Sequence, residues 1–207
     1  QPGQVLGTVR GAIRSLLKGE RTALNFLQRL SGIATLTRAY ANVVEGTGAR
    51  ILDTRKTTPN LRFLEKYAVH AGGGENHRFG LHDMILIKNN HVDAAGGVSP
   101  ALIRCLAFLK QKGLDLKIEV ETRSLSEVDE ALLYPVHRIM LDNMNPGEIR
   151  EAVRLISGKA ETEASGNIRL DNVRAVSETG VDFISVGALT HSAPALDISF
   201  RIEVMER

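Results

Sequence analysis

This sequence of 207 residues lacks several features that mark specialised classes of protein. Its single cysteine, Cys105, excludes an internal disulfide, and a reducing cytoplasm is therefore the expected location. No apolar run approaches the ~18 residues that a membrane span needs, and no secretory signal pattern is visible. The net charge of +2 lacks the positive excess typical of nucleic-acid binding. We therefore expect neither a membrane nor a nucleic acid as a partner.

The residues that are present describe an ordinary globular chain. Hydrophobic residues make up 43% and charged residues 24%, as in typical folded domains. The length allows one sizeable α/β domain, or a domain with a fragment of another. Residues 1–20 begin without methionine and alternate short apolar pieces with glycines, which is typical of the end of a β-rich region. We expect this region to continue a longer upstream sequence.

The first half of the chain mixes helical and strand patterns. Apolar residues at helical spacing predict a helix over residues 20–45, which Gly32 is expected to interrupt or bend. A strand then ends near Asp53, where "LDTRKTTPNLR" concentrates basic and hydroxyl residues. The further elements expected before residue 114 are a helix in "LRFLEKYAV", a strand with a polar end in "MILIKNNHV" and a helix over 99–113.

The second half is more regular. Strands are predicted at residues 116–122, 137–143, 160–167 and 181–188, and a helical pattern follows each of the first three. Their centres lie about 21 to 23 residues apart, as in consecutive βα units with parallel strands. Such a series forms either a barrel or an open, doubly wound sheet.

Polar residues gather where these strands end. They are Asp53, Thr54, Arg55, Lys56, Lys88, Glu121, Asp142, Ser165, Gly166, Asn167, Gly187 and Ala188. In a (β/α) barrel the carboxyl ends of the strands converge on one mouth, where chemistry takes place. In an open sheet these groups would be spread along an edge. The number of polar strand ends favours the barrel.

Two acids and two glycine turns are candidates for substrate binding. If Glu121 and Asp142 face one mouth, they suit a hydrated Mg²⁺ or a developing positive charge; otherwise they are surface acids. The turns at 165–167 and 186–188 let backbone N–H groups approach an anion closely. Because barrel phosphate sites often use the loops of the last strands, the pair favours a phosphate pocket over plain tight turns.

A basic cluster follows the glycine-rich loop "GGGENHRFG". His77 and Arg78 lie in this loop, and Lys88 follows ten residues after Arg78. Arginine offers a two-pronged fork for a carboxylate and lysine a point charge, so the cluster resembles an anion clamp; the alternative is a flexible turn. His91 lacks the partners of a zinc site. Arg21 stands at the expected start of a helix, where the dipole disfavours a cation. This indicates either a role in reaching a partner subunit or a plain solvated side chain.

Taken in order, the motifs resemble a known family. They are "ERTALNFLQRLSGIAT", "LDTRKTTP", "GGGENHRFGL", "ILIKNNH", "IEVET", "IMLDNM", "EASGNI" and "DFISVGALTHSAPALDIS". The set resembles quinolinate phosphoribosyltransferase, also called nicotinate-nucleotide pyrophosphorylase (carboxylating). The resemblance runs over residues 1–202, and the order of the motifs makes it specific.

The resemblance implies an α/β fold with an incomplete barrel of about seven strands and remnants of an N-terminal α/β sandwich. The implied divisions are the end of the sandwich domain at 1–20, connecting helices at 21–48, the barrel at 49–195 and a return segment at 196–207. The family works as a homodimer or a hexamer built from dimers. The resemblance further implies that Arg21 reaches the active site of the neighbouring subunit.

The implied reaction belongs to NAD biosynthesis. The phosphoribosyl group of phosphoribosyl pyrophosphate is transferred to quinolinate with decarboxylation, which gives nicotinate mononucleotide, pyrophosphate and CO₂ and requires Mg²⁺. The implied catalytic residues are Lys88, Glu121 and Asp142, and the two acids also hold the ribose hydroxyls and Mg²⁺, directly or through water.

The resemblance assigns the other site residues by the groups that they face. The cations facing quinolinate are Arg21 of a partner, Arg55, His77, Arg78 and Lys88. Lys56 and Lys88 face the sugar phosphates, with Thr54 beside them. The residues around the 5′-phosphate are Ser165, Gly166, Asn167, Val186, Gly187, Ala188 and His191. Arg62 is expected to be a surface residue.

Two alternatives remain open. One is a molybdenum-transport-associated homologue of the same fold, in which the lysine of "IKNNH" is absent, so Lys88 favours the quinolinate enzyme. The other is a non-catalytic oligomerising fragment, because most of the N-terminal domain is missing.

Overall fold

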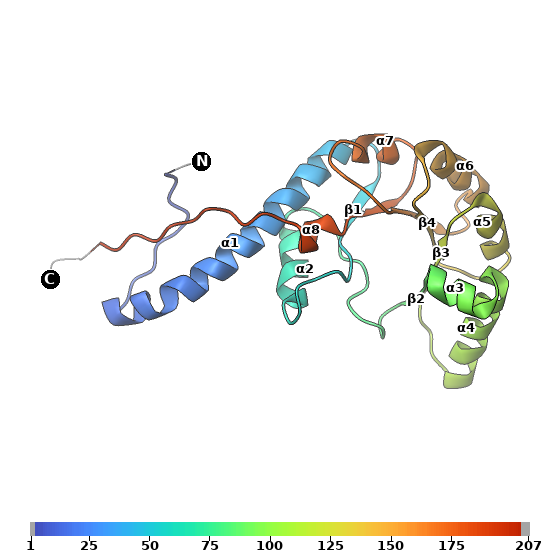
Figure 1. Ribbon diagram of the computed structural model, residues 1–207, viewed down its shortest axis with the longest axis horizontal. Helices are drawn as coiled ribbons and strands as arrows, with labels where there is room; N and C mark the ends of the chain where they lie inside the picture. The colour runs from blue at the N-terminus through green and yellow to red at the C-terminus, as the bar shows by residue number, and fades with distance from the viewer. Residues whose placement is uncertain (1–2, 204–207) are drawn as a thin grey trace.

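The computed structural model describes residues 3–203, in which six parallel strands form one curved sheet with helices on its outer side (Figure 1). The strands are β1 (Arg50–Leu52), β2 (Ile85–Ile87), β3 (Ile118–Thr122), β4 (Arg138–Asp142), β5 (Glu161–Ser165) and β6 (Phe183–Ser185). Their order in the sheet is β1-β6-β5-β4-β3-β2. This is the cyclic order of a barrel with one seam left unpaired, between β1 and β2.

The incomplete α/β barrel is therefore confirmed, with six strands in the described residues where about seven were expected. On the side of β1 away from β6, a single parallel bridge joins Leu52 to Glu75. Glu75 donates its N–H to Ile51 at 2.8 Å, and Asp53 donates to the Glu75 carbonyl at 3.2 Å. The chain near Glu75 thus pairs as an extra strand would, but only for one residue.

Helices cover the outer face of the sheet. They are α2 (Arg62–Ala71), α3 (Asn89–Ala95), α4 (Val98–Lys112), α5 (Leu125–Ala131), α6 (Pro146–Ile156) and α7 (Val173–Ser177). The short helix α8 (Ala188–His191) follows the end of β6 instead. The four predicted strands after residue 116 are confirmed, as is the helix expected over 99–113. The helix α3 was missed, because its residues were assigned to the polar end of a strand. The helix has only seven residues before Gly96, where φ is 90°. A stretch this short does not show a recognisable helical periodicity in the sequence.

The side chains of each strand alternate between the helices and the barrel interior. On β3, Ile118 and Val120 are buried in the apolar core beneath the helices. The residues between and after them, Glu119 and Glu121, point to the opposite face. The same alternation carries polar residues inward from β4 and β5. The barrel therefore has an apolar outer layer and a largely polar interior, which decides where the chemistry can lie.

One long helix, α1 (Ile13–Val44), covers a region where the sequence predicted a β-rich start and a helix interrupted or bent at Gly32. The β-rich pattern expected over residues 1–20 is wrong for the described part, since residues 3–12 form no strand and residues 13–20 are helical. Gly32 does not interrupt the helix. A Cβ atom on Gly32 would lie 1.9 Å from the Pro194 carbonyl oxygen, so glycine is required for close packing of the chain's end.

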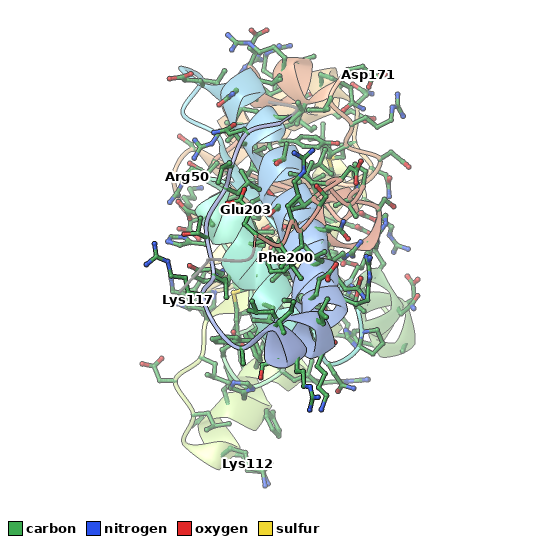
Figure 2. All side chains as sticks on the ribbon, turned by 90° about the vertical axis from the view of Figure 1, so that its left-hand side faces the viewer. Arg50, Lys112, Lys117, Asp171, Phe200 and Glu203 are labelled. Atoms are coloured by element: carbon green, nitrogen blue, oxygen red, sulfur yellow. The ribbon has the colours of Figure 1, made fainter. Side chains whose placement is uncertain are left out.

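The segment after α8 runs back along α1, while the predicted return from residue 196 to an N-terminal domain stays a prediction. Leu196 donates its N–H to the Gln28 carbonyl at 3.0 Å, and the Gln28 side chain donates to the Ile198 carbonyl at 2.9 Å. Figure 2, seen from the end where α1 projects, shows Phe200 over this helix. Residues 204–207 of the predicted return segment lie outside the described residues.

Replacing Gly32 by alanine is expected to destabilise the fold by about 1–3 kcal/mol, because the new methyl group overlaps the Pro194 carbonyl. Urea denaturation measures the loss. The control is Gly19→Ala in the same helix, where nothing lies within 4 Å of the added atom. That change should be neutral or stabilising, since alanine favours a helix more than glycine does. Equal midpoints for both variants would contradict the packing role of Gly32.

Among the residues from 3 to 203, no single helix has the length and apolar character to cross a membrane. The bent pair α3 and α4, at 94°, passes that test only when the two helices are taken together.

Candidate active site

The mouth of the barrel brings the two predicted acids together. Asn89, the first residue of α3, donates its backbone N–H to Glu121 Oε2 at 2.8 Å. Its side-chain Nδ2 donates to Asp142 Oδ2 at 2.9 Å. One residue thus holds a carboxylate from β3 and a carboxylate from β4. The predicted approach of Glu121 and Asp142 is therefore confirmed. The bridging role of Asn89 was not predicted, although its position directly after a predicted strand could have indicated it.

Lys88 stands beside this pair. Its Nζ lies 3.5 Å from Glu121 Oε1, and its side chain is 50% exposed. Its backbone N–H donates to His91 Nδ1 at 2.9 Å, so the ring of His91 caps α3. This capping hydrogen bond accounts for the position of the His91 ring without a metal ligand role. Lys88 is held at the mouth with its ammonium group open to a ligand.

Arg55 and Arg78 form the basic side of the mouth. Arg78 donates Nη1 to the Met84 carbonyl at 3.0 Å. Burial, and after it the neighbouring Arg55, lower the pKa of Arg78. The Nε atoms of both arginines are buried and have no hydrogen-bond partner among the residues described. Two close guanidinium groups with unused donors suit an anionic ligand, and the anion clamp of His77, Arg78 and Lys88 stays a prediction.

Arg62 is not the surface residue that was expected. It is partly buried and donates Nε to Thr57 Oγ1 and Nη1 to the Phe79 carbonyl, both at 3.1 Å. It also reaches the Arg55 carbonyl at 3.5 Å. Arg62 therefore ties the loop after β1 to the loop before β2. Sequence spacing gave no sign of this, because the contact joins segments brought together only by folding.

Lys56 lies against the last turn of the barrel. Thr190 donates Oγ1 to the Lys56 carbonyl at 2.9 Å, and Lys56 donates its N–H to Thr54 Oγ1 at 3.0 Å. A Cβ atom on Gly187 would lie 3.1 Å from His191 Nε2 and 3.3 Å from Lys56 Cδ. Lys56, Gly187 and His191 thus meet around one small space beside Ala188.

The turn after β5 continues the same rim. Ser165 is the register partner of Asp142 on β4. Gly166 has φ of 100°, and a Cβ atom there would lie 2.2 Å from Asn143 Oδ1, so this turn needs glycine. Asn167 donates Nδ2 to that Asn143 oxygen at 3.0 Å. Val186, directly after β6, donates its N–H to the Leu52 carbonyl, and its side chain is buried in the core.

Arg21 lies apart from these residues. The helix α1 begins at Ile13, so Arg21 is more than two turns inside it and not at its start. The argument from the helix dipole was therefore wrong. Arg21 is exposed, and the first half of α1 projects beyond the barrel (Figure 1). Its predicted reach into another subunit stays a prediction.

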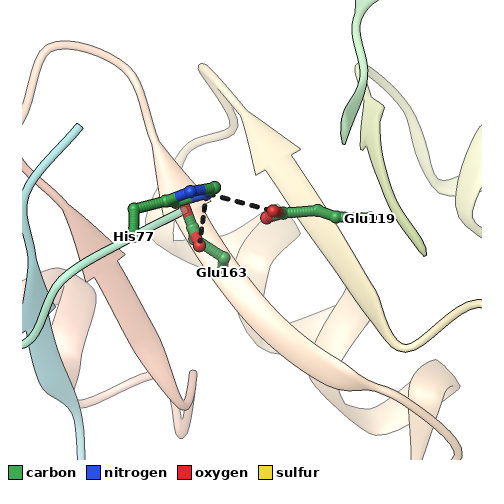
Figure 3. Close-up of side chains that lie close together, drawn as sticks. All are labelled: His77, Glu119 and Glu163. Carbon is green, nitrogen blue, oxygen red and sulfur yellow. Dashed lines mark ion pairs between the residues drawn. The ribbon is translucent and has the colours of Figure 1, made fainter. Parts of the chain in front are cut away.

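His77 turns toward the barrel interior. Its Nδ1 accepts the Arg78 N–H at 2.7 Å, and its Nε2 lies 3.0 Å from Glu119 Oε2 and 3.6 Å from Glu163 Oε2 (Figure 3). Burial lowers the pKa of His77, against the opposing effect of Glu163. The His77 ring is therefore neutral at pH 7, and its Nδ1 holds the backbone N–H of Arg78.

Glu119, Glu163 and Arg138 complete this interior layer, and sequence reasoning missed all three. Arg138 donates Nη1 to Glu163 Oε2 at 2.9 Å. Burial raises the pKa of Glu163 to about 8 and that of Glu119 to about 7, although Arg138 acts in the opposite direction on both. The alternation in "IEVET" and "ETEAS" was the available signal, because it places Glu119 with Glu121 and Glu163 with Ser165.

Comparison with known proteins agrees with this arrangement. Residues 33–201 match the family profile described as quinolinate phosphoribosyl transferase, C-terminal domain, and residues 1–31 match the N-terminal domain of the same family. The chain belongs to the quinolinate phosphoribosyl transferase family. The limits predicted for the four parts of the chain stay predictions.

Individual members of the family are similar over nearly the whole chain. The "Quinolinate phosphoribosyltransferase [decarboxylating] 1b" of Nicotiana tabacum is 51% identical over 97% of this chain and 61% of its own length. The "Probable nicotinate-nucleotide pyrophosphorylase [carboxylating]" of Bacillus subtilis is 46% identical over 97% of this chain and 68% of its own. This chain thus spans about 61% of the length of the plant relative.

Solved structures show the same fold. The crystal structure of NadC from Streptococcus pyogenes superposes with a TM-score of 0.85 at 47% identity, over 90% of this chain and 65% of that one. The nicotinate-nucleotide pyrophosphorylase from Francisella tularensis gives 0.85 at 44% identity, over the same shares of the two chains.

Proposed function

We propose that this chain carries the catalytic barrel of a decarboxylating quinolinate phosphoribosyltransferase. It would transfer the phosphoribosyl group of phosphoribosyl pyrophosphate to quinolinate and give nicotinate mononucleotide, pyrophosphate and CO₂. The observation that carries the proposal is the pair Glu121 and Asp142, joined by Asn89 and flanked by Lys88 at the barrel mouth. The names of the similar plant and bacterial proteins support it.

The basic side of the mouth suits quinolinate, which carries two carboxylates. Arg55 and Arg78 have buried Nε donors that no described residue uses. A carboxylate accepts two parallel bonds from such a fork. Lys88 adds a point charge on the side toward Glu121. His77 is neutral and contributes by holding the Arg78 backbone, while contact between its ring and the substrate is proposed only from the family resemblance.

The acidic side suits the ribose and a magnesium ion. Glu121 and Asp142 are both partly exposed at the mouth and share one neighbour, Asn89. Carboxylate oxygens with room for water are the donor set that Mg²⁺ prefers, so the residues fit the ion. Bound there, Mg²⁺ would neutralise charge on the pyrophosphate leaving group. The two carboxylates would hold the ribose hydroxyls and stabilise positive charge as it develops on the sugar ring.

The rim between β5 and α8 suits the 5′-phosphate. Gly166 and Gly187 keep side chains out of the turns, and Lys56 and His191 lie beside Gly187. No protein nucleophile is needed, because the pyridine nitrogen attacks the sugar. The protein's contribution is then chiefly positioning and electrostatic stabilisation.

The proposed assembly is a homodimer, or a hexamer built from dimers, in which Arg21 enters a neighbouring site. Large apolar side chains are exposed on α1 and the segment before it, which supports self-association. They are Val5, Leu6, Val9, Ile13, Leu17, Phe26 and Leu27. A cytoplasmic location is proposed from the single cysteine, although the similar Arabidopsis protein is named chloroplastic.

The test is a product assay with quinolinate, phosphoribosyl pyrophosphate and Mg²⁺, read by chromatography for nicotinate mononucleotide. Product and CO₂ are expected in equal amounts, and chelation of Mg²⁺ should abolish both. Gel filtration in parallel gives the oligomeric state. A well-folded oligomer that forms no product would refute the proposal and favour the oligomerising fragment. Folded protein that binds quinolinate poorly would favour the molybdenum-transport-associated homologue.

A further inference from the structure

One arginine on α1 joins three other segments of the chain. Arg29 donates Nε to Glu65 Oε1 at 3.2 Å and Nη2 to the same oxygen at 3.0 Å. Its Nη1 donates to the Ala193 carbonyl at 3.2 Å, and its Nη2 also donates to Thr58 Oγ1 at 3.4 Å and to the Thr190 carbonyl. One guanidinium group therefore connects α1 to α2, to the loop after β1, and to α8 with the residues that follow it.

Glu65 makes the matching contacts from α2. Its side chain is 0% exposed. It accepts the Thr58 backbone N–H on Oε2 at 3.0 Å and the Thr58 hydroxyl on Oε1 at 2.8 Å. A buried ion pair is costly unless further hydrogen bonds satisfy its oxygens. Both oxygens of Glu65 are used here, and the groups that satisfy them fix Thr58 in the loop after β1.

The same loop is held against α8 at Lys56, two residues before Thr58. The Thr190 side chain is buried, and its hydroxyl donates to the Lys56 carbonyl at 2.9 Å. On the other side of Lys56, a Cβ atom on Gly187 would lie 3.3 Å from Lys56 Cδ. Lysine has a flexible four-carbon stem, so the position of its backbone decides which groups the ammonium can reach.

We propose that Arg29 and Glu65 are positioning residues for the proposed 5′-phosphate site. They act through Thr58 and Thr190, and they set the distance between Lys56 and Gly187. Each of the three guanidinium nitrogens of Arg29 already has a protein acceptor, so its part is to hold the loop and not to contact the substrate. The inference rests on the proposed function, which supplies the identity of the ligand.

A second arginine holds the same loop from its other side. Arg62 donates to Thr57 Oγ1 at 3.1 Å and reaches the Arg55 carbonyl at 3.5 Å. Arg55 belongs to the side of the mouth that suits quinolinate, whereas Lys56 lies beside the proposed phosphate site. Loss of Arg29 is therefore expected to affect the phosphate-bearing substrate, and loss of Arg62 is expected to affect quinolinate.

Binding of ribose 5-phosphate tests the inference without requiring turnover. This probe carries the phosphate of the sugar donor and is titrated into the folded protein by calorimetry. Thr190→Val removes the hydroxyl that holds the Lys56 carbonyl and closely keeps the side-chain shape. Affinity is expected to fall about three- to tenfold, as for the loss of one hydrogen bond. The matched control is Thr37→Val, where an equally buried hydroxyl donates to the Ile33 carbonyl within α1, and affinity should not change.

The two arginines provide a second comparison, by steady-state kinetics. Arg29→Lys keeps a positive charge beside Glu65 but lacks the fork of donors that the network uses. It should raise the KM for phosphoribosyl pyrophosphate about tenfold at constant kcat, with the KM for quinolinate unchanged. Arg62→Lys should raise the KM for quinolinate instead. A purely structural role would lower the stability of the variants to urea without separating the two substrates.

Unchanged ribose 5-phosphate affinity in folded Thr190→Val and Arg29→Lys would overturn the inference, as would failure of the unmodified protein to bind this probe. Circular dichroism checks folding, and Thr190→Val decides alone if Arg29→Lys does not fold. The proposed function fails separately. A protein that forms no nicotinate mononucleotide, but whose ribose 5-phosphate binding weakens in the variants as expected, would refute the activity and retain the positioning role.

Discussion

Replacing Lys88 by alanine is expected to lower turnover by about two to three orders of magnitude while leaving the fold intact. A positioned charge that stabilises the transition state contributes this much when water is excluded. The Lys88 side chain is half-exposed at the mouth, and its Nζ lies 3.5 Å from Glu121 Oε1. The measurement is steady-state product formation with quinolinate and phosphoribosyl pyrophosphate, with circular dichroism as a check on folding.

The control for this variant is Lys112→Ala. Lys112 ends α4 at an exposed position away from the strand ends, so turnover should not change. A fully active Lys88→Ala enzyme would contradict the assigned role and weaken the distinction from the molybdenum-transport-associated homologue. A variant that loses only affinity for quinolinate, at constant turnover, would make Lys88 a binding residue and not a catalytic one.

Replacing Asp53 by alanine is expected to destabilise the fold by about 3–5 kcal/mol, because it leaves a buried ammonium group unpaired. Lys66 Nζ donates to Asp53 Oδ1 at 2.5 Å, and both side chains are almost fully buried. Lys66 also donates to the His77 carbonyl at 2.8 Å, while Asp53 accepts the His77 N–H at 2.8 Å. The pair thus connects the end of β1 to the basic loop. Urea denaturation measures the change.

The double variant Asp53→Leu with Lys66→Met provides the comparison. It removes both charges and keeps apolar volume, so it should be more stable than Asp53→Ala. Its residual loss would reflect the hydrogen bonds to His77. If Asp53→Ala is no less stable than the double variant, the unpaired charge is not the cause. A loss of quinolinate binding in the stable double variant would show that the pair also positions His77 and Arg78.

The sequence was most informative about the second half of the chain. Strands near 119, 140, 163 and 184 were predicted from their apolar residues and regular spacing, and all four are present. It was less informative where helix and strand patterns overlap. The helix α3 was taken for the polar end of β2, and the start of α1 was taken for strand, because short apolar pieces broken by glycine fit either structure.

Residues whose roles depend on distant contacts could not be predicted. Gly32 looked like a helix break, but its reason is the Pro194 carbonyl, 162 residues later in the chain. Arg62 looked like a surface residue, yet it joins Thr57 to Phe79. Asn89 was expected only as part of the polar end of a strand, yet it holds both acids of the mouth. In each case the partner lies in another segment.

The sequence by itself determined the α/β class, the parallel strands and the polar residues at their carboxyl ends. These follow from local patterns, because side chains alternate along a strand and βα units have a characteristic length. Only the tertiary structure decided which inward side chains meet. Curvature of the sheet brings His77 to Glu119 and Glu163, and no spacing within one segment specifies that approach. The interior cluster is therefore a property of the folded barrel.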